Sequence, residues 1–358
     1  MDTRLDLDLD LSGPELTAEL CDIASVSGAE RVLADAVEAA LRRLPHLRID
    51  RDGDTIVART ELGRAERVVV AGHLDTVPIA GNLPTRRDGH VLWGRGTADM
   101  KGGVAVALRL AAHLSEPKTD VTYVFYDNEE VEAERNGLGR IARTHPDWLG
   151  ADFAVLMEPT SAAVEGGCNG TLRVAVAVPG VAAHSARSWM GRNAIHEAAR
   201  VLERLRAYRP AEVAVDGLVY REGLNAVAIE GGIAGNVIPD RCVVTVNYRF
   251  APHQDEATAL AHVREVFDGY DIDLLDSAPG ARPGLDRPAA AAFVTAVDTE
   301  VRAKVGWTDV ARFSELGVPA VNYGPGDPQL AHADDERVDV REIEQCEARL
   351  RAWLGGGL

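Results

Sequence analysis

The sequence has 358 residues, of which 46% are hydrophobic and 26% charged, and its formal net charge at pH 7 is -18. This length exceeds one compact core of ordinary size and predicts two lobes, and the composition is that of a folded globular chain rather than a disordered one. The negative charge would repel nucleic acid and an anionic membrane surface, so we expect neither as a partner.

Four cysteines, Cys21, Cys168, Cys242 and Cys346, lie far apart without a Cys-x-x-Cys pair. Their spacing fits neither a thiolate zinc site nor a disulfide framework and predicts reduced, buried thiols. The first residues, MDTRLDLDLDLSG, alternate Leu with Asp and lack the apolar stretch of a secretion signal. No apolar run approaches the ~18 residues of a membrane span. We therefore expect a cytoplasmic protein.

The first half of the chain alternates helices with buried strands. Residues 14–43 have the period of one long amphipathic helix. Three apolar, β-rich runs follow, and each ends in polar residues: ERVVVAGHLD, VTYVFYDNEE and DFAVLMEPT. Helices over 101–114 and 134–144 are expected between them. This order predicts layers of helices on a sheet, an α/β fold.

The pattern changes near residue 170, where TLRVAVAVPG alternates as a strand with one exposed face does. The expected order is then strand, helix (192–208), strand (226–233), strand (241–250), helix (254–267) and strand (270–275). This is the split βαβ, or ferredoxin-like, pattern. Buried α/β patterns return with a helix over 289–303, a strand over 318–323 and a helix over 340–354.

The change of pattern predicts a domain organisation. We expect one domain formed by residues 1–169 and 282–358, interrupted by an inserted domain at 170–281. The second boundary, SAPGARPGLDRP, is rich in Pro and Gly, as a hinge between domains is.

Ionisable residues stand at the ends of the predicted strands: His73, Asp75, Glu129, Glu130, Glu158 and His332. One histidine after a strand is more often a structural hydrogen-bonding group, and one Glu-Glu pair is more often a solvated helix start. Ligands of open α/β sheets bind beyond the carboxyl ends of the strands, so six such residues together predict a metal site.

The sequence around Asp75 and Asp99 suggests separate roles. In His73-x-Asp75 the carboxylate can accept a hydrogen bond from the imidazole nitrogen that does not bind metal. Asp99 lies in the Gly-rich segment GRGTADMKGG, which could be a phosphate loop, but GxxxxGK[ST] is absent. A carboxylate can instead bridge two metal ions that lie ~3.5 to 4 Å apart.

The adjacent Glu129 and Glu130 should divide the work, because neighbouring side chains diverge and cannot easily bind the same ion. One would ligate while the other removes a proton from water. Spacing alone leaves open which glutamate does which. Glu158 and His332 would each supply a ligand, and this mixture of imidazole and carboxylate suits two Zn²⁺, with Co²⁺ or Mn²⁺ able to substitute.

Six segments, HLDTVP, GRGTADMKGG, DNEE, MEPT, VAAHSAR and the late His332, resemble in order and context the dinuclear zinc aminoacylase and glutamate carboxypeptidase-like metallopeptidases. The resemblance covers nearly the whole chain and implies a zinc-peptidase-like α/β/α catalytic domain. It assigns His73 and Glu158 to one zinc, Glu130 and His332 to the other, Asp99 as the bridge and Glu129 as general base.

The resemblance also implies that the inserted domain is a lid that forms a homodimer. In that family a lid histidine reaches the partner's active site and stabilises the oxyanion, and His184 in AHSA occupies its place. Without the resemblance His184 would be taken for an ordinary surface histidine.

Within the family, DNEEVEAERNGLG, GWTDVARF and NYGPGDPQLAHADDE are most similar to members that hydrolyse N-succinyl-LL-2,6-diaminopimelate to LL-2,6-diaminopimelate and succinate, on the route to lysine. Such an acyl-amino-acid substrate carries several carboxylates, which arginine binds in a bidentate fork. The candidate substrate contacts are Arg249, Asn236, Arg312, Thr308 and the backbone at Gly324.

Other functions remain open. Many desuccinylases carry a doubled asparagine where this chain has Gly235 and Asn236, and an arginine where it has Cys168. Acetylornithine deacetylase, aminoacylase or dipeptidase activity would use the same chemistry. A catalytically inactive binding protein is a further alternative, but it predicts a broken metal set, and this set is complete.

Overall fold

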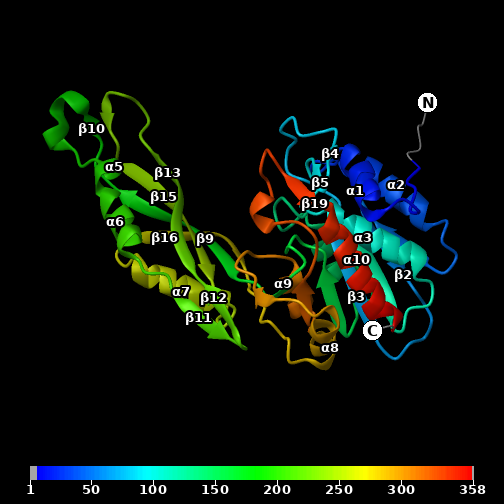
Figure 1. Ribbon diagram of the computed structural model, residues 1–358. Coiled ribbons are helices and arrows are strands. Elements are labelled where there is room, and N and C mark those ends of the chain that lie inside the picture. The colour runs from blue at the N-terminus through cyan, green and yellow to red at the C-terminus, as the bar shows by residue number, and fades with distance from the viewer. Residues whose placement is uncertain (1–5, 357–358) are drawn as a thin grey trace. The chain divides into compact units, whose positions relative to one another are not determined.

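The computed structural model describes residues 6–356 (Figure 1). The chain divides into two compact units. The first contains the described residues up to Gly166, Gly284–Arg302 and those from Arg312 onward, and the second contains Gly167–Pro283 and Ala303–Ala311. Among the described residues, none of the helices has the length and apolar character needed to cross a membrane.

The first unit is built on a mixed sheet which, within residues 6–356, has eight strands in the order β1-β2-β6-β3-β7-β18-β8-β17. The strands β6, β3, β7 and β18 run parallel, and antiparallel strands flank them. The bounds are β1 Arg48–Asp52, β2 Thr55–Arg59, β3 Arg67–His73, β6 Asp120–Tyr126, β7 Phe153–Leu156, β8 Val164–Gly166, β17 Val301–Ala303 and β18 Ala320–Asn322.

Helices and short strands surround this sheet. The helices are α1 Gly13–Asp22, α2 Arg31–Leu41, α3 Lys101–His113, α4 Gly137–Thr144, α8 Pro288–Val297, α9 Val310–Glu315 and α10 Val340–Gly355. Short 3-10 helices span Pro146–Trp148 and Pro328–Leu330. A separate small sheet has the order β19-β5-β4, formed by Arg337–Asp339, Val91–Trp93 and Arg86–Asp88.

The central strands are buried on both faces, which is why their sequences are apolar runs rather than alternations. Every residue of β6 and all but the first residue of β3 are buried. On one face Val70 and Tyr123 join the main core, where helices α1, α3 and α10 pack against one another (Figure 1). The intervening residues Val69 and Val124 are buried as well, so the opposite face is also covered.

Two expected helices are shorter than the sequence indicated. The prediction of a single helix over 14–43 is wrong, because the first helix ends at Asp22 and a second helix begins at Arg31. Between them Val26 bridges to Thr76 beside β3, and Gly28 takes a positive φ of 87°. The helix predicted over 289–303 ends at Val297, and residues 301–303 form the edge strand β17.

The second unit contains the predicted split βαβ order. Its four-stranded antiparallel sheet has the order β13-β15-β9-β16. Its elements are β9 Gly170–Pro179, β10 Ala183–His184, the 3-10 helix Ser185–Met190, α5 Ala194–Glu197, α6 Ala199–Ala207, β11 Glu212–Val215, β12 Leu218–Arg221, β13 Gly223–Gly231, β14 Val237–Ile238, β15 Arg241–Phe250, α7 Glu256–Val266 and β16 Asp271–Ala278. The helix expected over 192–208 is therefore two short helices.

The buried face of this sheet packs on α5, α6 and α7 through a core of its own that includes Val176, Val201 and Val263. The predicted α/β fold class is thus confirmed. All four cysteines are buried, as their pattern predicted, and the structure has them as free thiols.

Phe293 of α8 is a critical contact of the first core. Its ring is fully buried and lies 5.2 Å from the ring of Phe153, 5.6 Å from Tyr323 and 4.8 Å from Trp353. Replacing it with Ala would leave a cavity, and we expect Phe293→Ala to lower the free energy of unfolding by about 3 to 5 kcal/mol in urea denaturation.

The matched control is Val32→Ala on α2, because the Val32 side chain is 55% exposed. This variant should change the free energy of unfolding by no more than about 0.5 kcal/mol. Equal effects of the two substitutions would show that the aromatic cluster does not hold α8 to the sheet.

Candidate metal centre

Three neighbouring parallel strands end at the same edge of the sheet and carry ionisable residues there. His73 is the last residue of β3 and lies opposite Tyr126, the last residue of β6. Glu129 and Glu130 follow β6 after a short turn, and Glu158 follows the end of β7. The parallel register, set by the buried strands, therefore brings these residues to one place.

The side chains form three overlapping groups, and within each group the potential ligand atoms lie within 4.8 Å of one another. These groups are His73, Asp99 and Glu158; Asp99, Glu130 and His332; and His73, Glu129 and Glu130. The structure thus brings together all the metal-site residues that the sequence indicated, including His332, which lies far along the chain.

Asp99 occupies the centre of the cluster. Its Oδ1 is 3.2 Å from Nε2 of His73, and its Oδ2 is 3.3 Å from Nε2 of His332. The same His332 nitrogen is 2.9 Å from Oε1 of Glu130. One carboxylate therefore faces two imidazoles through different oxygens, which is the arrangement that bridging two ions requires.

Asp75 is fully buried and orients the other residues. Its backbone oxygen lies 2.9 Å from Nδ1 of His73, and its Oδ1 lies 3.5 Å from the same nitrogen. The sequence suggested the carboxylate as the acceptor, whereas the carbonyl is nearer. A hydrogen on Nδ1 leaves Nε2, which faces Asp99, available to a metal ion.

The carboxylate of Asp75 has another use. Its Oδ1 accepts the backbone N–H of Glu129 at 2.9 Å, and its Oδ2 accepts that of Glu130 at 3.0 Å. Asp75 therefore connects the β3 end to the turn that carries both glutamates, so that a single residue sets the position of three others.

The electrostatics of the cluster follow from its surplus of carboxylates. Burial opposes the charged form of His73, but hydrogen bonds to Asp75 and Asp99 outweigh it and raise its pKa well above the usual value. Hydrogen bonds to Asp99 and Glu130 raise the pKa of His332 to about 10. Burial opposes ionisation of Asp99, but both imidazoles hold its pKa below the usual range. The negative potential that attracts these protons would equally attract divalent cations.

The donor set fits a pair of divalent metal ions. Imidazole nitrogens and carboxylate oxygens are ordinary ligands of such ions, and each three-residue group offers one atom per residue at ligating separation. Half-buried Glu129 belongs to the group with His73 and Glu130, so its carboxylate is also part of the cluster.

Sequence reasoning missed Glu336, which fixes the Asp99 loop. Its Oε1 accepts the backbone N–H groups of Ala98 and Asp99 at 3.0 Å each, and its Oε2 accepts a hydrogen bond from buried Arg95 at 2.9 Å. Glu336 is fully buried and lies shortly after His332 in the chain. A carboxylate so close in sequence to a predicted ligand was the available signal.

Four predicted functional residues belong to the second unit. His184 is exposed, and its Nδ1 accepts the N–H of Ala186 at 3.1 Å. Exposed Asn236 accepts the N–H of Ser185 through its backbone oxygen at 2.9 Å. Their roles in catalysis and substrate binding remain predictions.

The other two are more enclosed. Arg249 on β15 is half-buried, donates from Nε to Oδ1 of Asn247 at 3.2 Å, and has a pKa lowered by burial. Thr308 is buried, and its backbone oxygen lies 3.7 Å from Sγ of Cys168. Their proposed contacts with substrate remain predictions as well.

Arg312 and Gly324 lie in the first unit. The Arg312 guanidinium lies against Gly139 at the start of α4, where a Cβ on that glycine would be 2.7 Å from Nη1. Gly324 donates its N–H to Oγ1 of Thr160 at 3.1 Å and accepts the N–H of Ala162 at 3.0 Å. Both backbone groups of Gly324 are therefore engaged within the unit.

Comparison with known proteins identifies the family. The model of peptidase family M20/M25/M40 matches residues 69–355. The chain belongs to this family of metal-dependent hydrolases. A DapE protein of Mycobacterium tuberculosis is 58% identical over 97% of this chain and 100% of its own length. The succinyl-diaminopimelate desuccinylase of Corynebacterium glutamicum is 47% identical over 99% of this chain and its own full length.

Solved structures share the fold. A tripeptidase from Staphylococcus aureus superimposes with a TM-score of 0.75 at 19% identity, covering 95% of this chain and 96% of its own. The metallo-carboxypeptidase Sso-CP2 from Sulfolobus solfataricus gives a TM-score of 0.76 at 16% identity, covering 96% and 99%. At these identities the likeness establishes the fold alone.

Metal binding should depend strongly on pH, because the raised pKa of His332 means that its imidazole is protonated at pH 7 in the metal-free cluster. That proton stabilises the metal-free fold at low pH, and the contribution is lost as the pH rises through about 10. A metal ion needs the neutral imidazole, so its affinity should strengthen over the same rise, with release of protons.

Calorimetric titration of metal-depleted protein with Zn²⁺, in buffers of different ionisation enthalpy, measures that release. We expect proton release at pH 7 and less of it in His332→Gln, with weaker zinc binding at pH 6 than at pH 8. Heats that are independent of the buffer would contradict this description of the cluster.

Proposed function

We propose that the chain hydrolyses N-succinyl-LL-2,6-diaminopimelate to LL-2,6-diaminopimelate and succinate, as a desuccinylase of lysine and diaminopimelate biosynthesis. The observation that carries the proposal is the likeness, across the full length of both chains, to the Corynebacterium glutamicum enzyme of that name. The complete metal cluster of the first unit supports it, since amide hydrolysis by this family requires a metal centre.

The metals proposed are two Zn²⁺, for which Co²⁺ or Mn²⁺ can substitute. The group of His73, Asp99 and Glu158 offers one ligand set, and the group of Asp99, Glu130 and His332 offers the other. Asp99 is common to both groups, which supports its assignment as the bridge. The chemistry that such ions supply when bound is polarisation of the substrate carbonyl and a lowered pKa for water.

Glu129 is the proposed general base. It lies beside the ligand Glu130, and its backbone is held by Asp75, so its carboxylate is presented to the cluster from a fixed turn. It would take the proton of the attacking water and return it to the nitrogen of the leaving amine. Its partial burial would keep that proton from exchanging freely with solvent.

The second unit is the proposed lid and dimerisation domain. His184 would stabilise the developing oxyanion from the partner subunit, and Arg249 would bind a substrate carboxylate with help from Asn236, Arg312 and Thr308. The backbone at Gly324 is a further proposed contact, and its N–H would have to leave Thr160 to reach the substrate. Trp189 and Met190 lie in the 3-10 helix that follows His184, and their side chains are 79% and 66% exposed, which supports a role for this segment in contact with a partner.

The proposed location of the protein is the cytoplasm, where the four free cysteines would stay reduced.

The substrate proposal is tested by comparing amine release from N-succinyl-LL-2,6-diaminopimelate with release from N-acetylornithine, before and after chelation. We expect release from the succinyl substrate, loss of this activity with the chelator and recovery when Zn²⁺ is restored. Amine release from the acetyl substrate alone would agree with metal-dependent amide hydrolysis but would refute the proposed desuccinylase activity.

The role of Glu129 is tested by Glu129→Gln, which preserves size but removes the basic carboxylate. We expect kcat to fall by at least about 100-fold, the range attributed to general base catalysis, while bound zinc measured by elemental analysis stays at the wild-type level. A Glu130→Gln variant should instead lose bound metal, so the pair separates base from ligand. Equal loss of metal in both variants would contradict the assignment of Glu129 as the base and Glu130 as a ligand.

A further inference from the structure

Glu30 is a buried carboxylate outside the metal cluster. It is 1% exposed and is the last residue before helix α2. Its Oε1 accepts two backbone N–H groups, that of Gly28 at 2.9 Å and that of Asn128 at 3.1 Å. Burial raises its pKa, an effect that these backbone hydrogen bonds only partly offset. Burying an ionisable group is costly, so the contact with Asn128 calls for a reason beyond packing.

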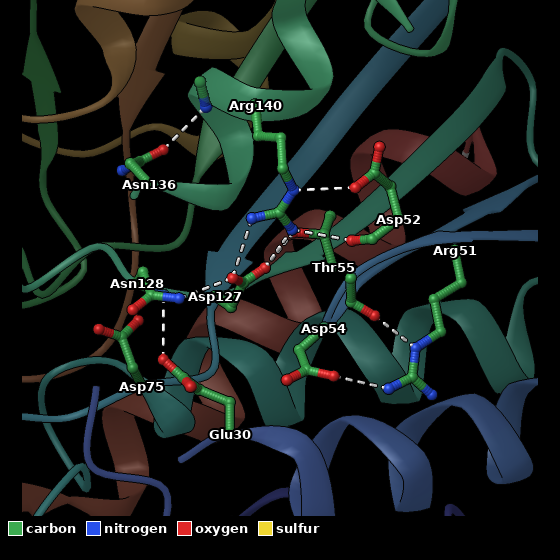
Figure 2. Close-up of polar contacts among 12 residues, drawn as sticks. Glu30, Arg51, Asp52, Asp54, Thr55, Asp75, Asp127, Asn128, Asn136 and Arg140 are labelled. Atoms are coloured by element: carbon green, nitrogen blue, oxygen red, sulfur yellow. Dashed lines mark hydrogen bonds and ion pairs between the residues drawn. The ribbon is translucent and has the colours of Figure 1, made fainter. Parts of the chain in front are cut away.

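Asn128 immediately precedes Glu129 and has an unusual backbone conformation. Its φ is 57°, in the left-handed region, which Asn tolerates better than most residues. Its N–H goes to Glu30, and the next two N–H groups, those of Glu129 and Glu130, go to Asp75. Two buried carboxylates therefore hold three consecutive peptide groups of the turn, and Figure 2 shows Asn128 close to both Glu30 and Asp75.

The two carboxylates are connected through one segment, residues 25–30. Ser27 donates its hydroxyl to Oδ2 of Asp75 at 2.7 Å. The backbone of Ser27 donates to Thr76 at 3.1 Å, and Thr76 donates back to Ser25 at 3.0 Å. The interruption between α1 and α2 is therefore a strand-like strip that fixes Glu30 relative to the end of β3.

The opposite side of the turn is held by charge. Asp127 accepts two hydrogen bonds from Arg140 of α4, at 2.7 and 3.1 Å, and one from Thr55 at 2.6 Å (Figure 2). Asp127 in turn accepts the Asn128 side-chain amide at 2.7 Å. Asn128 is thus held through its side chain by Asp127 and through its backbone by Glu30.

We propose that Glu30 is a positioning residue for the general base, acting through the Asn128 peptide to hold the Glu129 carboxylate in its reactive position. This inference rests on the proposed role of Glu129. Without the Glu30 oxygen the Asn128 N–H would lose its acceptor, and the turn could leave the left-handed conformation that directs Glu129. Misplacement of a reacting group by about 1 Å commonly costs about 100-fold in rate, so a small relaxation is enough.

Asp120 provides a matched control at the start of β6, the strand that leads into the turn at Asn128. It is a buried carboxylate that also accepts two backbone N–H groups, those of Leu62 at 2.8 Å and Arg64 at 2.9 Å. It begins β6, whereas the turn at Asn128 follows the end of β6. Removing the Asp120 carboxylate therefore measures how much a buried carboxylate of this kind contributes to stability, at a position that does not affect the metal cluster.

The experiment compares Glu30→Ala, Glu30→Gln, Glu30→Asp and Asp120→Ala in zinc-loaded enzyme, each at equal folded fraction. We expect Glu30→Ala to lower kcat about 10- to 100-fold with KM within about twofold of wild type and zinc content unchanged. Glu30→Gln keeps an oxygen in the Oε1 position and should recover most of kcat. Asp120→Ala should lower the melting temperature but keep the wild-type kcat.

If Glu30→Ala does not fold, Glu30→Asp still tests the proposal. The shorter side chain keeps the carboxylate but withdraws its oxygen from the Asn128 N–H, so this variant should also lower kcat while KM stays at the wild-type value. The proposal would be overturned if the Glu30 variants had the same kcat as Asp120→Ala, or if their loss of activity came from a raised KM or from missing zinc.

Glu129→Gln is measured in parallel. If Glu129→Gln stays active, the proposed base is itself wrong. If Glu129→Gln is inactive but Glu30→Ala is active, only the role of Glu30 is refuted.

Discussion

Mutual repulsion of carboxylates is the constraint on which this structure depends. Five acidic side chains meet two imidazoles at one sheet edge: Asp75, Asp99, Glu129, Glu130 and Glu158. Such a cluster would spread apart unless positive charge or oriented dipoles opposed the repulsion. Divalent ions would supply the charge, and the protein supplies dipoles at Asp75, whose carboxylate accepts the N–H groups of Glu129 and Glu130. Backbone N–H groups also point at Glu30 and Glu336, two further carboxylates that hold the surrounding turns.

These supporting carboxylates follow a common plan. Asp75 accepts from the turn after β6, Glu30 accepts from the residue before it, and Glu336 accepts from the Asp99 loop. None of the three is a proposed metal ligand. Each joins segments that are distant in the chain, so the ligands are placed by hydrogen bonds to peptide groups and less by contacts with one another. A centre built in this way can keep its geometry before a metal ion arrives.

Much of this could be predicted from the sequence, because burial and chemistry leave local patterns. The apolar runs of β3, β6 and β7 predicted the strands, and polar residues at their ends predicted the metal cluster. The family resemblance was needed to decide which of Glu129 and Glu130 is the metal ligand and which is the general base, because the two adjacent side chains are chemically identical. The break in the first helix was missed because residues 23–30 carry no proline, and the pairing of Val26 with Thr76 is a tertiary interaction. Glu30 was missed because a buried acceptor of backbone N–H groups looks like any surface glutamate in sequence, and Glu336 was missed although it lies close to the predicted ligand His332 in the chain.

The parallel register of β3 and β6 has a consequence for how this chain can change in evolution. Each strand residue advances the chain by about 3.3 Å, so a slip of two residues, which keeps the same face buried, would move the glutamate turn by about 6.6 Å from His73. Metal coordination tolerates deviations of only about 0.2 Å. An insertion or deletion of two residues within one of these strands would therefore keep the same face buried but abolish the centre. Length variation should accumulate instead at sites such as the turn at Gly217 between β11 and β12, which joins strands that carry none of the ligands.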